Sequence, residues 1–437
     1  MSSTPVDVVE VVCWGRRVGA VALNPGTGWY AFAYSPEWVE TGVELAPLHM
    51  PCRRDPYEFA ELPRATFDGL PALLADSLPD AFGNALVNAW MAEHGVARDQ
   101  ITPLDRLAFA GDRAMGALEF RPPARTDDEQ RPAALTLADL VLAARLTVRG
   151  EFVGSEAARS ALQQLIAVGT SAGGARAKAV VSFNPQTWQV RSAFAPPADE
   201  FEPWIIKLDG VSGTGTDGHG DRLGERAPYG RIEYAYHLMA QAAGIEMTPC
   251  RLLAEGPRRH FMTRRFDRGE HGERLHVISL CALAHLDYNM IATHSYDQYL
   301  QAVTALDLGA DGRREAYRRM VFNVMAVNHD DHTKNLSFLR PQGGDWRLAP
   351  AYDVTHAYRP DSQWTSRHLM VVNGKVAEIG LDDLHAVGER NDVPGYRRLV
   401  RDVREAVDTW RAFAEEAELD DPAAKAVADD IERFRPR

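Results

Sequence analysis

The spacing of apolar residues divides the chain into a β-rich first part, a mixed middle and a helical last part. Short runs of β-branched and aromatic residues predict strands over 8–14, 17–23 and 29–35. Apolar residues at helical spacing over 70–95 predict a helix, and residues 116–122 predict a further strand. A polar, proline-rich stretch at 121–132 is predicted to be a linker.

Beyond this linker, helices and strands alternate before helical spacing takes over. Periodicity predicts helices over 136–146, 160–168 and 232–244. Runs of apolar and β-branched residues predict strands over 179–183, 189–194, 203–210 and 259–268. After about residue 275 the spacing is mostly helical, with one pair of short strands expected at 336–340 and 346–350.

Composition and charge exclude several classes of protein. The chain has 437 residues, of which 45% are apolar and 25% charged, as in a globular protein with a substantial core. Its net charge of −13 disfavours sequence-independent binding of nucleic acid, which requires clustered cations. The four cysteines lie far apart without a CxxC pair, which argues against structural zinc and a disulfide framework. With neither a signal peptide nor an apolar stretch of about 18 residues, we expect a cytoplasmic protein without membrane contact.

A dense cluster of polar residues follows the apolar run at 320–327. The sequence NHDDHTKNLSFL (328–339) places Asp330 and Asn335 in the pattern D-x-x-x-x-N, the spacing of a protein-kinase catalytic loop. In that chemistry the aspartate accepts the proton of the substrate hydroxyl, and the asparagine helps to hold Mg²⁺. Asp353 comes eighteen positions after Asn335, beyond the predicted hairpin, so the chain can return a second hard oxygen ligand to the same place.

Upstream residues follow in the order that a kinase requires. Gly173 and Gly174 precede a strand, where their backbone N–H groups can cradle phosphate oxygens. Lys207 lies among apolar residues of a predicted strand, where a cation either reaches solvent from the strand end or takes an anionic partner such as phosphate. Glu233 can pair with Lys207 or serve only as an acidic residue in the first turn of its helix. The stretch at 262–268 is predicted to offer backbone groups to adenine as a hinge.

Other patterns leave alternatives open. GTGTDG (213–218) matches G-x-G-x-x-G, but the next helical pattern begins about a dozen residues later, which favours a surface loop over a dinucleotide site. A metal phosphohydrolase of the HD type would use His329 and Asp330 with the nearby histidines His285, His294 and His332. A kinase fold without catalytic activity that serves as a binding partner is the third alternative.

Several longer motifs are specific when taken together. They are SLPDAFG (77–83), GDRAMGALEF (111–120), SAGGARAK (171–178), IIKL (205–208), RRFDR (264–268), NHDDHTKNLSFL, LAPAYDVTHAY (348–358) and WTSRH with VNGK (364–375). In these motifs, which span nearly the whole chain, the sequence resembles the HipA family of bacterial serine/threonine kinases, the toxin components of type II toxin–antitoxin systems.

The resemblance implies an α+β fold, namely a protein-kinase-like, two-lobed structure with a β-rich N-terminal subdomain and a mostly helical C-terminal lobe. We expect the N-terminal subdomain, the kinase N-lobe and the C-lobe at 1–125, 126–268 and 269–437. The implied cofactors are ATP and Mg²⁺. Asp330 is implied as the catalytic base, with Asn335 and Asp353 as Mg²⁺ ligands. Lys207 is implied as the lysine that binds the ATP phosphates.

Four of the motifs are expected to contact the nucleotide. The predicted residues are Ser171, Ala172, Gly173, Gly174, Lys178, Lys207, Arg264, Phe266 and His332. The family's phosphate loop also carries a regulatory autophosphorylation site, which corresponds to Ser171 here, with Thr170 as the rival acceptor. A phosphate on Ser171 would stand where the ATP phosphates must lie, so like-charge repulsion should eject the loop and silence the enzyme.

Two residues depart from the common family pattern. Asp331 stands where glycine is common, and Arg176 where others carry glutamine. Neither change removes a group that the mechanism requires. The best-known substrates of the family are aminoacyl-tRNA synthetases, and the usual partner is a small, HipB-like helix-turn-helix antitoxin that binds DNA. The resemblance therefore predicts such an antitoxin as partner, and contact with DNA only through it.

Overall fold

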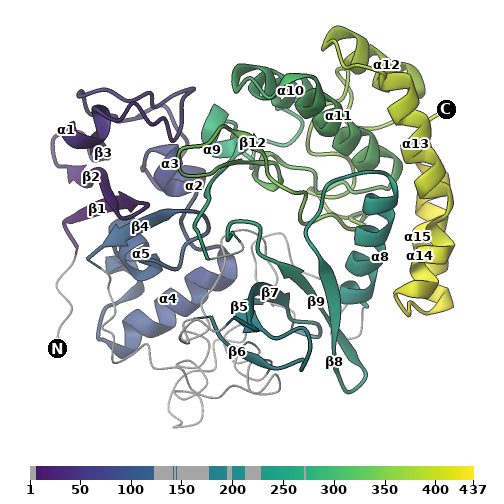
Figure 1. Ribbon diagram of the computed structural model, residues 1–437, viewed down its shortest axis with the longest axis horizontal. Helices are drawn as coiled ribbons and strands as arrows, with labels where there is room; N and C mark the ends of the chain where they lie inside the picture. Colours follow the sequence, from purple (N-terminus) through teal and green to yellow (C-terminus); the bar gives the residue numbers. More distant parts are fainter. Residues whose placement is uncertain are drawn as a thin grey trace. The chain divides into compact units, whose positions relative to one another are not determined.

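The structure of the protein is a computed structural model (Figure 1), which describes residues 6–122, 141, 144, 177–193, 199–211, 228–269 and 272–437. These residues form two compact units. Unit 1 contains the described residues up to 211 together with Met262–Ile278, and unit 2 contains those from 228 to Phe261 together with Ser279–Arg437. Several predicted features lie wholly or mostly outside the described residues: the helices at 136–146 and 160–168, the linker and the GTGTDG loop.

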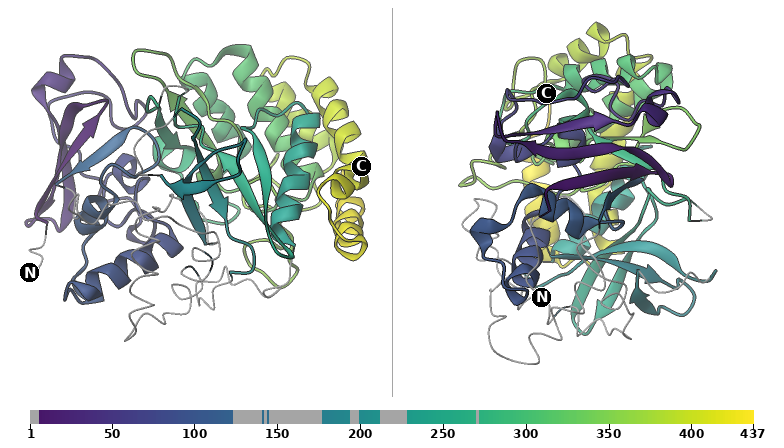
Figure 2. Two further views of the ribbon diagram at one scale, coloured as in Figure 1. Left: turned by 60° about the horizontal axis from the view of Figure 1, so that its bottom comes forward. Right: turned by 90° about the vertical axis from the view of Figure 1, so that its left-hand side faces the viewer.

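A four-stranded antiparallel sheet lies at the start of unit 1. Its order is β3-β2-β1-β4, and its strands are β1 (Val8–Cys13), β2 (Arg16–Asn24), β3 (Trp29–Tyr34) and β4 (Leu118–Arg121). Because β1 pairs with both β2 and β4, the last strand of this region, β4, forms one edge of the sheet beside the first strand, β1. Both views of Figure 2 show these purple and blue strands side by side. The four strands predicted for this part of the chain are confirmed.

Helices fill the stretch between β3 and β4. The longest, α4 (Ala81–Glu93), begins at Asp80, whose carboxylate accepts a hydrogen bond from the Gly83 N–H (2.7 Å). α5 (Pro103–Ala110) begins with a capping box formed by Thr102 and Asp105. The shorter helices are α1 (Pro36–Val39), α2 (Arg64–Phe67), α3 (Ala72–Ala75) and η1 (Arg98–Gln100). The helical stretch predicted over 70–95 is present but interrupted, because the structure has two helices there, α3 and α4.

Three antiparallel strands of unit 1 carry the two lysines that are predicted to contact the nucleotide. β5 pairs with β6 and with β7, and the strands are β5 (Lys178–Phe183), β6 (Val190–Ser192) and β7 (Glu202–Lys207). The register places Lys178 opposite Lys207, so the two side chains leave the same face of the sheet. β9 (Arg258–Arg264) begins in unit 2 and ends in unit 1, where the Arg265 N–H donates to the Pro203 carbonyl oxygen (2.9 Å).

Unit 2 is mostly helical, as predicted. α8 (Tyr229–Ala242) is followed by Gly244, whose φ of +81° is the left-handed conformation that ends many helices. α11 (Gly309–Met325) packs against α10 and α13, and the apolar run at its end is buried. The other helices, green to yellow in Figure 1, are α9 (Leu280–Ala284), α10 (Tyr296–Ala305), α12 (Leu381–Arg390), α13 (Tyr396–Asp408), α14 (Trp410–Glu416) and α15 (Asp421–Arg433).

The strands of the last part of the chain correct one expectation. β11 (Ser337–Arg340) and β12 (Arg347–Leu348) form the predicted hairpin, and β8 (Cys250–Glu255) precedes β9. β10 (His276–Ser279), however, lies where only helical spacing was expected, and that expectation was wrong. Four residues are too few for periodicity to separate a strand from a helix.

The described residues also bear on the cysteines and on membrane contact. All four cysteines are free, in agreement with the expected lack of a disulfide framework. Within the described ranges, no helix combines the length and the apolar character that crossing a bilayer demands.

Candidate active site

The candidate site begins where α11 ends. Val327, just beyond the helix, has a φ of +57°, a left-handed conformation that is strained for a β-branched residue. Asn328 is held by two hydrogen bonds to Asn323, one from its N–H to the carbonyl oxygen (2.9 Å) and one from Nδ2 to Oδ1 (3.0 Å). Such strain persists only where the surroundings impose it. The polar cluster therefore starts from a fixed point on a buried helix.

Asp330 and Asn335 are brought together by local folding. The single turn η4 (Thr333–Asn335) bends the chain back, and Asn335 Nδ2 donates to the backbone carbonyl oxygen of Asp330 (3.0 Å). The Asp330 side chain is 39% exposed, so a substrate hydroxyl can reach it, and its Oδ1 lies 3.7 Å from His332 Nε2. Because the nitrogen of the Asn335 amide is engaged, its orientation is fixed and its oxygen is the atom that can serve a metal.

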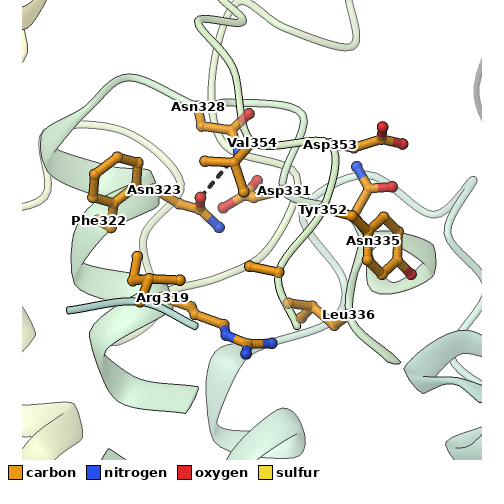
Figure 3. A pocket seen from close by; sticks show the side chains of 12 residues that line it. Arg319, Phe322, Asn323, Asn328, Asp331, Asn335, Leu336, Tyr352, Asp353 and Val354 are labelled. Atoms are coloured by element: carbon orange, nitrogen blue, oxygen red, sulfur yellow. Dashed lines mark hydrogen bonds between the residues drawn. The ribbon is translucent and has the colours of Figure 1, made fainter. Parts of the chain in front are cut away.

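The β11–β12 hairpin returns Asp353 to the same loop. Tyr352 OH donates to the Lys334 carbonyl oxygen (2.7 Å) and lies 2.5 Å from Ser337 Oγ, which ties the end of the hairpin to its beginning. Asp353 itself has a left-handed φ of +53°. Asn335 and Asp353 both line one pocket, in which Figure 3 shows them near each other. The structure thus brings the two predicted metal ligands together, and their role stays a prediction.

The donor set of this pocket suits Mg²⁺. A carboxylate oxygen and an amide oxygen are hard ligands, and Mg²⁺ usually takes one or two carboxylates together with phosphate and water. Asp353 and Asn335, both half-buried, supply such a pair. The remaining ligands of a bound Mg²⁺ would be phosphate oxygens and waters.

The histidines fit the phosphohydrolase alternative poorly. In the part of the chain that the structure describes, no three His, Cys, Asp or Glu side chains are grouped as a metal site. His329 is buried, and its Nδ1 lies 3.1 Å from the Thr365 carbonyl oxygen. Burial, together with the neighbouring His368, lowers the pKa of His329 to about 3. His329 therefore belongs to the packing around the loop.

The two lysines predicted to contact the nucleotide, Lys178 and Lys207, lie in unit 1. Lys178 Nζ is 3.1 Å from Asp80 Oδ2, and both side chains are only 4% exposed. This buried ion pair joins the start of β5 to the first turn of α4, and each charge depends on the other. Lys207 is half-buried at the end of β7. Its convergence with Asp330, Asn335 and Asp353 stays a prediction, as does its pairing with Glu233, which is buried in α8.

The RRFDR motif contains a buried charge cluster in unit 1. The Asp267 side chain is wholly buried and accepts hydrogen bonds from Arg265 (2.9 and 2.6 Å), Arg268 Nη1 (2.6 Å) and the Gly116 N–H (2.7 Å). Burial alone would raise the pKa of Asp267, but the two guanidinium groups lower it well below its usual range. The cluster joins the GDRAMGALEF motif to the RRFDR motif.

The remaining predicted contacts are only partly described. Arg264 ends β9 and Phe266 follows shortly after it, and both are half-buried. Their contact with the nucleotide stays a prediction. The phosphate loop lies outside the described residues, including Thr170, Ser171, Ala172, Gly173 and Gly174.

Asp331 had no predicted role, yet it is buried in unit 2. Its fully buried carboxylate accepts hydrogen bonds from Tyr296 OH and His368 Nδ1, both at 2.9 Å. Its partners are 35 and 37 positions away along the chain, beyond the reach of any local spacing rule. The two adjacent aspartates lie in a polar stretch, and no local signal in the sequence marked Asp331 as the one that turns inward.

The structure has a β-rich first part and a helical last part, and the hairpin returns Asp353 to the D-x4-N loop. These are the features expected of the HipA-like kinase class that the motifs predicted. The sequence matches the family model of the HipA-like C-terminal domain over residues 170–435 and that of the HipA N-terminal domain over residues 9–121. Since the first match alone covers more than half of the chain, the chain belongs to the HipA family. The predicted resemblance is confirmed, and the finer division at 1–125, 126–268 and 269–437 stays a prediction.

Two known proteins illustrate the relationship. A chain of the Shewanella oneidensis MR-1 toxin–antitoxin complex of HipA, HipB and its operator DNA aligns with a TM-score of 0.66 and 16% identity, covering 98% of this chain and 95% of that one. This likeness confirms the predicted fold class. A Sinorhizobium fredii protein named "Putative kinase Y4dM" is 27% identical over 180 residues, which are 40% of this chain. The match spans only 42% of that protein's length.

Proposed function

We propose that this chain is a protein serine/threonine kinase that uses ATP and Mg²⁺, and that it is the toxin of a HipA–HipB-like toxin–antitoxin system. Its membership of the HipA family supports the proposal. The observation that carries it is the pocket lined by Asn335 and Asp353, beside the loop in which Asn335 also bonds the backbone of Asp330. A kinase requires a base and two metal-binding groups in one place.

Each residue has one task in the proposed reaction. Asp330 accepts the proton of the substrate hydroxyl while the hydroxyl oxygen bonds to the γ-phosphorus and the bond to the departing ADP oxygen breaks. Asn335 and Asp353 hold Mg²⁺, which neutralises phosphate charge when bound. Lys207 binds the ATP phosphates. Most of the rate then comes from positioning and charge neutralisation.

The proposed partners derive from the family. A HipB-like helix-turn-helix antitoxin is the proposed protein partner, and the similar Shewanella complex contains HipA, HipB and operator DNA. We expect contact with DNA only through such an antitoxin, because a net charge of −13 disfavours direct binding. The proposed substrate is a protein of translation such as an aminoacyl-tRNA synthetase, and the proposed compartment is the cytoplasm.

The proposed activity is tested by following the γ-phosphate of ATP. With γ-labelled ATP and Mg²⁺, the protein should label itself or a protein in a bacterial lysate, and mass spectrometry of the labelled band identifies the substrate. A metal phosphohydrolase would release inorganic phosphate or nucleoside without labelling any protein, and a binding module would do neither. Either of these last two results would contradict the proposal.

The Asp353→Asn variant should need more Mg²⁺ than the wild-type protein. The change removes one negative charge from the metal site, so the rate at fixed Mg²⁺ should fall at least about 10- to 100-fold, the loss that even outer-shell partners of a metal cause. The rate should recover partly as Mg²⁺ is raised. The matched control is Asp345→Asn, the same change at an exposed aspartate before β12. An unaltered Mg²⁺ titration for Asp353→Asn would rule out its role as ligand.

Self-phosphorylation should occur on Ser171. Intact-mass spectrometry of the wild-type protein after incubation with ATP should show one added phosphate, and the Ser171→Ala variant should show none while it still phosphorylates its substrate. The phosphorylated wild-type protein should lose activity because the new dianion repels the ATP phosphates. A Ser171→Ala variant that still gains a single phosphate would assign the site to Thr170.

A further inference from the structure

Asp330 and Asp331 are adjacent carboxylates with opposite surroundings. The Asp330 side chain is 39% exposed, whereas the Asp331 side chain is fully buried. A buried carboxylate is costly unless several donors satisfy it. This costly buried carboxylate lies directly beside the proposed catalytic base, where its hydrogen bonds can hold other residues in position.

Four donors converge on the Asp331 carboxylate. Oδ2 accepts from Tyr296 OH (2.9 Å) and His368 Nδ1 (2.9 Å), while Oδ1 accepts from the backbone N–H of Leu369 (2.7 Å) and, at 3.4 Å, from that of Met370. Three of the four donors belong to consecutive residues, and only His368 among the four can carry a positive charge. The Asp331 carboxylate therefore binds one short piece of the chain, residues 368–370.

That piece belongs to residues 354–372, the post-Asp353 segment, which has little regular secondary structure. Two further residues of the segment, Ala357 and Thr365, also contact the loop at 327–331. The Ala357 N–H donates to the Val327 carbonyl oxygen (3.1 Å), and the His329 N–H donates to the Ala357 carbonyl oxygen (3.2 Å). His329 Nδ1 also lies 3.1 Å from the Thr365 carbonyl oxygen. Of these hydrogen bonds between loop and segment, Asp331 makes the largest number, and only those of Asp331 involve a charged carboxylate.

We propose that Asp331 is a positioning residue that holds the post-Asp353 segment against the Asp330 loop without any phosphorylation of that segment. The inference rests on the proposed kinase function. In kinases, the chain beyond the metal-binding aspartate is often ordered only when a phosphate on it pairs with arginine. Here the ordering anion is a carboxylate of the catalytic loop itself. The same anchor fixes the backbone that aims the Asp330 side chain outward.

The test is the Asp331→Asn variant, which keeps the shape of the side chain but turns one acceptor into a donor. Amide hydrogen exchange over 354–372 should become faster. The rate of self-phosphorylation at saturating γ-labelled ATP should fall about 100-fold, the loss expected when a catalytic group moves by about 1 Å. The ATP concentration that gives half of this rate should not change. If Asp331 were only structural, the variant would lose thermal stability without a fall in rate at an unchanged half-saturating ATP concentration.

The control is Asp105→Asn, the same change at another buried aspartate, which belongs to unit 1 and caps α5. It should leave both the rate and the exchange over 354–372 as in the wild type. If Asp331→Asn does not fold, His368→Phe serves instead, because it deletes one donor of the segment itself and keeps the carboxylate. Faster exchange over 354–372 supports the anchor, and unchanged exchange overturns it.

Two results separate this inference from the proposed function. If the wild-type protein transfers no phosphate, the kinase proposal fails, and hydrogen exchange still tests the anchor. If the wild-type protein is active, mass spectrometry should find no phosphate on residues 354–372. Activity confined to molecules that carry phosphate in that segment would overturn the inference while leaving the kinase proposal intact.

Discussion

The Asp330→Ala variant is expected to lose protein phosphorylation from γ-labelled ATP. The side chain is proposed to accept the substrate proton, and positioned general bases contribute about 100- to 10,000-fold to a rate. A loss of this size would bring labelling below detection in a gel assay. Because the Asp330 side chain is 39% exposed and its backbone carbonyl still accepts the Asn335 hydrogen bond, the fold should survive.

Two measurements make this result specific. The thermal unfolding of Asp330→Ala should agree with that of the wild type within about 0.5 kcal/mol, as for ordinary surface substitutions. The exposed residue Asp345, replaced by alanine as a matched control, should keep full labelling. An Asp330→Ala variant that labels protein at the wild-type rate would contradict the assignment of the base.

The Asp267→Ala variant is expected to have the largest effect on stability. The substitution leaves Arg265, which is 6% exposed, and Arg268 without the carboxylate that compensates their charge. Breaking a buried ion pair by removing one partner costs about 3–5 kcal/mol. It also removes the acceptor of the Gly116 N–H, so the GDRAMGALEF and RRFDR motifs lose their shared link. Chemical denaturation should show an earlier transition for unit 1.

The same cluster predicts a pH dependence with a definite sign. The pKa of Asp267 is lower in the folded protein than its usual value, so the unfolded chain binds a proton more readily. The stability that Asp267 contributes is complete above the unfolded carboxyl pKa of about 3.9 and is lost as the pH falls further. The variant should therefore lose less stability than the wild type between about pH 4 and pH 2. An alanine at exposed Asp99 is the control, and equal acid sensitivity of Asp267→Ala and wild type would refute this role.

Local spacing predicted those parts of the site that local folding builds. The Asn335 side chain reaches the Asp330 carbonyl within one turn of chain, so the D-x4-N pattern contains its own geometry. Asp353 was predictable for a similar reason, because a short hairpin separates it from Asn335 and hairpins return the chain to its starting point. In both cases few residues decide the outcome.

Contacts between distant segments were beyond sequence reasoning. Asp331 faces inward because Tyr296 and His368, 35 and 37 positions away, offer it donors. Asp267 meets the Gly116 N–H across 151 positions. Lys178 pairs with Asp80 at the start of α4, and its predicted contact with the nucleotide stays a prediction. Nothing in the local pattern of either partner announces these pairs, because tertiary packing selects them.

We propose that Lys207, Asp330, Asn335 and Asp353 serve one nucleotide and its metal ion. The most direct measurement is diffraction from crystals grown with Mn²⁺ and a non-hydrolysable ATP analogue, with the metal located by its anomalous signal. We expect a Mn²⁺ peak bound by the Asn335 amide oxygen and the Asp353 carboxylate, with the analogue's phosphates against Lys207 Nζ. A nucleotide bound away from these residues, with Lys207 directed elsewhere, would contradict it.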